Sequence, residues 1–125
     1  MKFARTVYGI AAAYGFVVLI PLYFLIDKIG RDTPPPIAHA EFYFGFIGLA
    51  LLWQVVFCLI AADPQRYRPI MLVTILEKIV FAVPVFIEFS RGRLPAASIW
   101  PAPVDLFLGL LFVIAYVRTR GKALR

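Results

Sequence analysis

The chain has one cysteine and one histidine among its 125 residues. Cys58 alone cannot form an intramolecular disulfide, and since it lies inside an apolar stretch we expect it to be a packing residue. His39 alone excludes a bis-histidine haem site and any histidine-rich metal cage built from this chain. The sequence also has no HExxH, GxSxG, P-loop, CxxC or dinucleotide-binding motif. These absences remove several classes of metal, redox and hydrolytic site.

Charged residues are scarce as well. They make up 16% of the chain, while hydrophobic residues make up 62% and the mean hydropathy is +0.87. Soluble domains contain only about 45–50% apolar residues, so a water-soluble fold is excluded. The formal net charge of +6 comes from basic residues that flank the apolar stretches, without exposed aromatic residues between them. This pattern predicts a lipid bilayer as partner and no nucleic acid.

Four apolar stretches fill most of the chain, at residues 7–26, 42–62, 70–89 and 99–117. A helix needs roughly 20 apolar residues to cross the hydrocarbon core of a membrane, and each stretch meets that length. Short connections between them favour antiparallel neighbours. The sequence therefore predicts an all-α integral membrane protein, with a single transmembrane domain over residues 1–125 folded as an up-down-up-down four-helix bundle.

Lysine and arginine residues are distributed unevenly between the two predicted sides. One side carries eight of them: Lys2, Arg5, Arg66, Arg68, Arg118, Arg120, Lys122 and Arg125. The other side carries four: Lys28, Arg31, Arg91 and Arg93. The positive-inside rule then predicts an N-in/C-in orientation, with both termini cytoplasmic. The membrane in which we expect the protein is the cytoplasmic (inner) membrane of a bacterium.

The first span contains signals for close packing and for a break in the helix. Ala11 and Gly15 form a small-xxx-small pair, which lets a neighbouring membrane helix approach closely. Pro21 leaves the carbonyl of Val17 without its helical donor, so a bend is expected there. The segment 27–39 is polar and then contains three consecutive prolines at 34–36, which cannot continue a helix and favour an extended polyproline conformation, so a longer, ordered loop is expected there.

Three acids and the histidine fall at the predicted outer end of the bundle. Glu41 begins the second span, Glu88 ends the third, and Asp105 lies early in the fourth, with His39 in the same layer. If these four side chains converge, they form a set suited to holding a divalent cation, relaying protons or binding a ligand head group. They are the candidate catalytic residues of this sequence, although we assign no metal site and no cofactor.

A simpler interpretation competes with this one. The helix dipole favours acids in a first turn, which by itself accounts for Glu41 and Asp105. Glu88 lies at a helix C-terminus, where negative charge is disfavoured, but the arginines that follow it are close enough to offset the charge. A histidine after three prolines is also typical of a solvated loop, which is the alternative for His39.

A second polar layer is expected nearer the cytoplasm. Gln54 and Glu77 lie at matching depths in the second and third spans, and we expect a hydrogen bond between them or a neutral Glu77. Glu77 and Lys78 point about 100° apart on a helix and are predicted not to pair well. Lys78 is predicted to extend toward the cytoplasmic interface.

One stripe of the last span carries Asp105, Gly109, Phe112 and Tyr116 at helical spacing. Together with the two polar layers, this stripe defines the ligand-binding residues that the sequence predicts: Glu41, Gln54, Glu77, Glu88, Asp105 and Tyr116.

Four short segments carry a likeness to known proteins: HAEFYFGF at 39–46, WQ at 53–54, DPQRYRP at 63–69 and LEK at 76–78. Over about residues 37–117, this pattern resembles small bacterial four-helix membrane proteins, loosely of the DoxX-like kind. The resemblance implies a four-helix membrane fold and carries no catalytic residues across.

Two functions are compatible with these features. The first is a non-enzymatic membrane component, either an accessory subunit of a membrane complex or a homo-oligomer, or a binder of a lipid-like or quinone-like small molecule. The second is a membrane enzyme or proton-coupled carrier that uses the outer acids with His39 for acid–base chemistry. The missing catalytic motifs favour the first and leave enzyme activity an open question.

Overall fold

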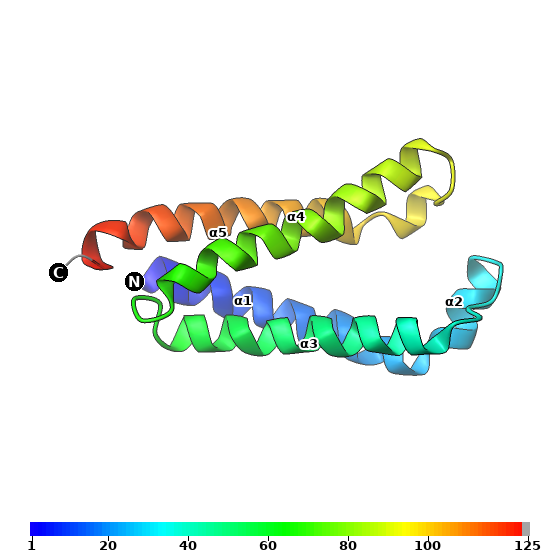
Figure 1. Ribbon diagram of the computed structural model, residues 1–125, viewed down its shortest axis with the longest axis horizontal. Helices are drawn as coiled ribbons and strands as arrows, with labels where there is room; N and C mark the ends of the chain where they lie inside the picture. The colour runs from blue at the N-terminus through cyan, green and yellow to red at the C-terminus, as the bar shows by residue number, and fades with distance from the viewer. Residues whose placement is uncertain (124–125) are drawn as a thin grey trace.

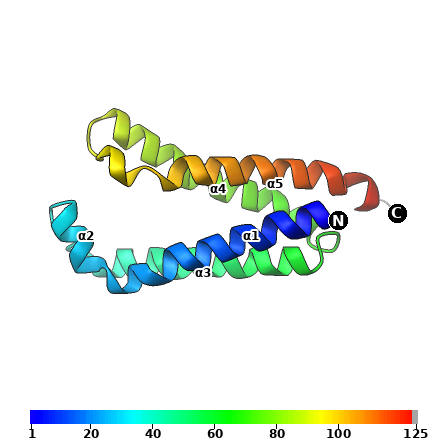
Figure 2. The same ribbon diagram turned by 180° about the vertical axis from the view of Figure 1, so that it is seen from behind.

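The structure is a computed structural model that describes residues 1–123, and all its regular elements within that range are helices. In chain order they are α1 (Lys2–Leu19), the 3₁₀ helix η1 (Ile20–Phe24), α2 (Ile26–Asp32), α3 (Ala40–Ala62), α4 (Arg68–Ser90), the 3₁₀ helix η2 (Ala96–Ser98) and α5 (Pro101–Ala123). The four long helices lie side by side in one bundle (Figures 1 and 2).

Four helical segments are long and apolar enough to cross a membrane: Lys2–Phe24, Ala40–Ala62, Arg68–Ser90 and Ala96–Thr119. They confirm the four predicted apolar spans, with ends that differ by a few residues. By length and composition they mark the chain as an integral membrane protein.

The connection between the first two spans contains two short helical segments. The α-helical ladder of α1 gives way to a 3₁₀ turn at Ile20, next to Pro21, which has no N–H to continue that ladder. Residues 26–32 then form the short helix α2, which turns away from the axis of α1 (Figure 2). Lys28 and Asp32 pair along this helix, which was not predicted. The helix ends at Asp32, just before the three prolines, as expected of residues that cannot continue a helix.

The long helices are arranged as two pairs, α1 with α3 and α4 with α5 (Figure 1). Arginine side chains tie each pair together at one end. Arg5 donates to the carbonyl of Ala62 over 3.2 Å, which joins the start of α1 to the end of α3. Arg68 donates to the carbonyl of Tyr116 over 3.0 Å and lies 3.7 Å from the centre of its ring. Both pairs are therefore closed at the same end of the bundle.

An aromatic core joins the two pairs at that end. Tyr8 of α1 stacks on Phe112 of α5, with ring centres 4.2 Å apart, and Phe57 of α3 meets both rings edge-on. The Tyr8 hydroxyl is 2.8 Å from the hydroxyl of Thr74 in α4. All four spans thus meet around fully buried side chains.

The start of α1, the 63–67 turn and the end of α5 lie at this closed end, while the connections 25–39 and 91–100 lie at the other (Figure 1). The two helix pairs diverge toward that second end (Figures 1 and 2). Of the basic residues used to predict orientation, Arg125 and the side chains of Arg120 and Lys122 lie outside the described part of the chain.

Candidate functional site

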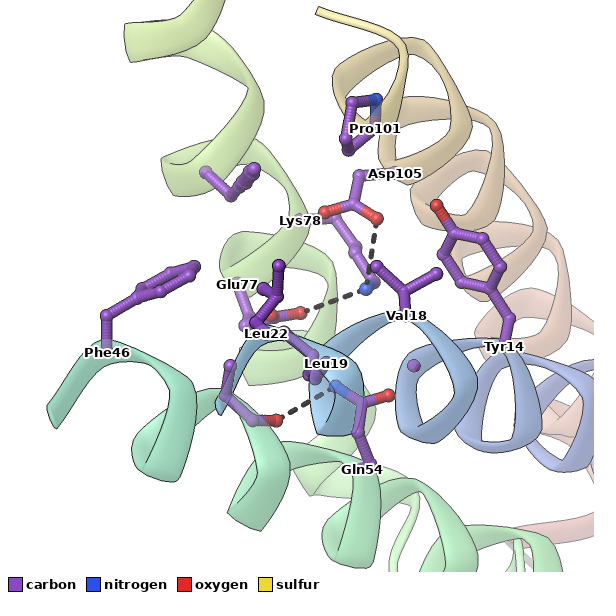
Figure 3. Close-up of a pocket in the computed structure, with 13 residues that line it drawn as sticks. Tyr14, Val18, Leu19, Leu22, Phe46, Gln54, Glu77, Lys78, Pro101 and Asp105 are labelled. Atoms are coloured by element: carbon purple, nitrogen blue, oxygen red, sulfur yellow. Dashed lines mark hydrogen bonds and ion pairs between the residues drawn. The ribbon is translucent and has the colours of Figure 1, made fainter. Parts of the chain in front are cut away.

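A partly open cavity of about 140 Å³ lies between the two helix pairs, and all four spans line it (Figure 3). Its apolar lining is Val18, Leu19, Leu22, Phe46, Ala50, Phe81 and Pro101. Its polar lining is Tyr14, Gln54, Glu77, Lys78 and Asp105, with the backbone of Gly15 beside them. The cavity therefore combines an apolar wall with a compact polar group in the interior of a membrane bundle.

Lys78 is the centre of the polar group. Lys78 is only 4% exposed, and its ammonium nitrogen Nζ lies 3.4 Å from Oδ1 of Asp105 in α5. The same nitrogen lies 3.5 Å from Oε2 of Glu77, one residue earlier in α4, and 5.1 Å from the ring centre of Phe57. Figure 3 shows both carboxylates directed at this one ammonium. A charged lysine at this depth is stable only with such partners.

Gln54 reaches the cavity because α1 carries a glycine opposite it. A Cβ at Gly15 would lie 1.9 Å from Oε1 of Gln54, which is closer than any real contact. The amide nitrogen Nε2 of Gln54 donates to the carbonyl of Ala50, one turn earlier in α3, over 2.9 Å. Gly15 therefore leaves room for a buried side-chain amide of α3 at the edge of the cavity.

Three buried polar atoms of the cavity have no hydrogen-bond partner within the described residues: the hydroxyl of Tyr14, Oε1 of Gln54 and Oε2 of Glu77. Oε2 of Glu77 has only the longer ion-pair contact to Lys78. Such atoms are costly in a membrane interior and are uncommon in folded proteins. All three atoms belong to residues that line the same cavity.

The predicted outer set does not converge. His39 and Glu41 lie on the surface, with Nδ1 of the histidine 3.4 Å from Oε1 of the acid. Glu88 accepts hydrogen bonds from Arg91 over 3.2 Å and from Arg93 over 3.0 Å. The simpler interpretation of Glu41 as a first-turn acid and of Glu88 as an arginine-neutralised acid fits these positions.

Asp105 is separated from the other outer acids because the fourth span begins deeper than predicted. The last turns of α4, the 91–100 connection and η2 extend beyond the start of α5 (Figure 1). Asp105 is the fifth residue of α5, is 9% exposed, and is level with Lys78 in the middle of α4. Its explanation as a first-turn acid was therefore wrong, because it follows the first turn and pairs inside the bundle.

The second polar layer differs from its prediction in its bonds. Gln54 and Glu77 do line one cavity, but Gln54 donates to its own helix and no hydrogen bond joins the two side chains. Lys78 does not extend to the interface, and it does pair with Glu77. The lysine stem is long enough to bring Nζ around the helix to its neighbour, which an argument from Cβ directions alone overlooks.

Tyr116 lies under Arg68 at the closed end of the bundle, not at the cavity. Cys58 lies on the outer surface of α3 and does not pack inside, contrary to prediction. Within residues 1–119, no group of three or more histidine, cysteine or acidic side chains is placed to hold a metal ion.

Sequence reasoning missed Tyr14 and Lys78 as members of the site. Lys78 did carry a signal: it lies ten residues after Arg68 and twelve before Ser90, so either helix end is more than about 15 Å away along the axis. A lysine side chain cannot cover that distance, and a central lysine therefore requires an acid on a neighbouring helix. Tyr14 carried no comparable signal, because tyrosine is also typical of packing and of interfaces.

A scan against known protein-family models, a search of the curated proteins and a search of the solved structures each found no match for this chain. The likeness to DoxX-like proteins stays a prediction. What the chain does must then be inferred from the cavity itself.

Proposed function

We propose that this four-span membrane protein binds a lipid-like or quinone-like small molecule in the cavity between its helix pairs, without acting on it chemically. The observation that carries the proposal is the cluster of unpartnered polar atoms around Lys78 within an otherwise apolar cavity. Ligand sites are typically apolar concavities with a few convergent polar groups that orient the ligand.

The dimensions of the cavity favour an amphipathic ligand. A closed cavity of about 150 Å³ accommodates a molecule the size of benzene. The volume of about 140 Å³ here accordingly suits one ring or one head group, and not a whole lipid. The remainder of the ligand would pass between the diverging helix pairs into the surrounding hydrocarbon. A polar head on an apolar tail meets both environments.

We further propose that the protein lies in the bacterial cytoplasmic membrane with its termini in the cytoplasm. Lys2, Arg5, Arg66, Arg68 and Arg118 support this orientation, since they cluster at the closed end of the bundle where α1 begins. The cavity then lies between the closed end and the extracytoplasmic connections.

Two adjacent valines allow a sharp test. Val18 lines the cavity, while Val17 is 73% exposed on the outside of the same helix. Val18→Trp fills the cavity, and Val17→Trp adds the same indole on the lipid-facing side. In native mass spectrometry of protein released from nanodiscs, we expect wild type and Val17→Trp to retain a small molecule. Val18→Trp should lose it.

A wild-type protein that leaves the nanodisc as a bare monomer would contradict the proposal, as would equal retention by both tryptophan variants. Release with another polypeptide or a second copy of this chain, and with no small molecule, would instead support the predicted accessory subunit or homo-oligomer.

The alternative function, a membrane enzyme or proton-coupled carrier built on the outer acids and His39, loses its geometric basis. Of the four residues that it requires, only Asp105 reaches the interior. Glu41 and Glu88 pair with residues of their own connections at the surface.

A further inference from the structure

The charges around the cavity discriminate between kinds of head group. Lys78 carries one formal positive charge, and Glu77 and Asp105 carry one negative charge each, so their formal sum is −1. These are the charged side chains among the residues that line the cavity. A negative sum in a low-dielectric interior favours the arrival of positive charge and opposes more negative charge.

Lys78 is not available to bind an anionic head group. Its ammonium already lies against Asp105 and Glu77 and over the ring of Phe57. An anionic head group would compete with two fixed carboxylates for this one cation and would be repelled by both. The repulsion between like charges held close together in a site raises the free energy of binding enough to exclude a ligand.

The hydrogen-bonding capacity of the unpartnered atoms also favours a positively charged head group. Gln54 is 3% exposed, and one N–H of its amide donates to the carbonyl of Ala50. Its unpartnered atom Oε1 is a carbonyl oxygen, which can only accept. Oε2 of Glu77, when ionised, is likewise an acceptor without a hydrogen-bond donor. The Tyr14 hydroxyl is able to donate or accept. The cavity thus has a surplus of acceptors, and a ligand that brings N–H donors satisfies them.

We propose that the cavity selects amphipathic molecules whose head group is a primary ammonium, over neutral and anionic molecules with the same tail. A primary ammonium supplies three N–H donors and one positive charge, which together match the acceptor surplus and the formal charge of the site. This inference rests on the proposed function and adds the chemical class of the ligand.

Three matched probes test the selectivity: a photoreactive dodecyl amine, and the dodecyl alcohol and dodecyl sulfonate that carry the same diazirine. Each is added to the full-length protein in phosphatidylcholine nanodiscs, and labelled residues are mapped by mass spectrometry. Labelling at Leu19 and Phe81, which line the cavity and are not among the exposed hydrophobic residues, is normalised to labelling at Phe42 and Leu49, which are exposed. We expect the amine to exceed the sulfonate at the cavity by at least about tenfold, and to exceed the alcohol clearly.

Three variants test which residues produce the preference for the amine. Glu77→Gln keeps the size of the side chain and removes one negative charge, so the advantage of the amine over the alcohol should fall several-fold. Gln54→Leu removes the unpartnered acceptor and should lower amine labelling. Glu88→Gln, at a half-buried acid outside the cavity, should change neither. Because the comparison of probes on wild-type protein needs no variant, a variant that fails to fold leaves the test intact.

The outcomes separate the two proposals. Equal labelling by the amine and the alcohol would overturn this inference, because the charges of the site would then already be neutralised. Stronger labelling by the sulfonate than by the amine would also overturn it. Either result leaves a ligand-binding cavity in place. Cavity labelling no greater than that of the exposed phenylalanine and leucine, with all three probes, would overturn the proposed function and this inference together.

Discussion

The two halves of this bundle are built from the same helices but differ in the hydrogen bonding of their buried polar groups. At the closed end, the hydroxyls of Tyr8 and Thr74 bond to each other, and the rings of Phe57 and Phe112 close around them. At the diverging end, polar atoms of Tyr14, Gln54 and Glu77 surround a cavity with no hydrogen-bond partners among the described residues.

The contrast shows which forces separate a structural region from a candidate site in a membrane protein. Lipid is as apolar as the core, so burial of apolar side chains contributes little, and packing and polar satisfaction decide stability. The closed end satisfies both. The diverging end satisfies neither fully, because it has a cavity and unpartnered polar atoms around it.

The largest expected effect comes from removing the central cation. Lys78→Met leaves two acids buried without their counter-charge, and we expect a loss of about 3–5 kcal/mol in the free energy of unfolding. The measurement is a denaturant titration in mixed micelles. Glu77→Gln and Asp105→Asn added to this variant should restore most of the loss. Lys28→Met is the control: its pair with Asp32 is exposed and should matter by less than about 1 kcal/mol. A small effect at Lys78 would show that the buried pairs do not form.

A smaller effect is expected from a substitution of Gly15, the glycine that leaves room for the Gln54 amide at the cavity. Gly15→Ala forces its methyl group into Gln54 and should destabilise the protein by about 1–3 kcal/mol, as overpacking does. Gln54→Ala in the same chain should relieve the clash. Gly9→Ala is the matched control, since nothing lies within 4 Å of its Cβ position. Thermal unfolding in nanodiscs measures all three, and equal shifts for both glycine variants would contradict the close approach.

The smallest effect compares the two halves directly. Tyr8→Phe removes a hydroxyl that is bonded to Thr74, and should cost about 0.6–1 kcal/mol, the usual range for interhelical hydrogen bonds in membranes. Tyr14→Phe removes a buried hydroxyl with no partner and should be neutral or slightly stabilising. The same unfolding assay detects both. If Tyr14→Phe proved the more costly change, the hydroxyl would have a partner in the empty protein and the contrast between the halves would fail.

Features that depend on local pattern were predictable. The four apolar spans follow from their length. The 3₁₀ turn at Pro21 follows from its missing N–H, and the close approach at Gly15 from its missing side chain. The offset of the charge on Glu88 by the arginines after it was also visible, because those residues are neighbours in the chain.

Features that depend on the depth of one helix against another were not predictable. Asp105 was placed with the outer acids because the fourth span was assumed to begin level with the end of the third. The structure shows that α4 extends past the start of α5, which lowers Asp105 to the level of Lys78 (Figure 1). A shift of this kind changes no hydropathy pattern, so the sequence carries no direct sign of it.

The amino-acid sequence by itself determined the number of helices that are long and apolar enough to cross a membrane, because hydrophobic length is a property that each segment carries alone. It also indicated that Gln54 and Glu77 lie at matching depths inside the bundle. Only the tertiary structure decided which polar groups meet. Pairing between helices depends on their relative depth and rotation, which are set by side-chain packing such as that of Gly15 against Gln54 and of the rings at the closed end.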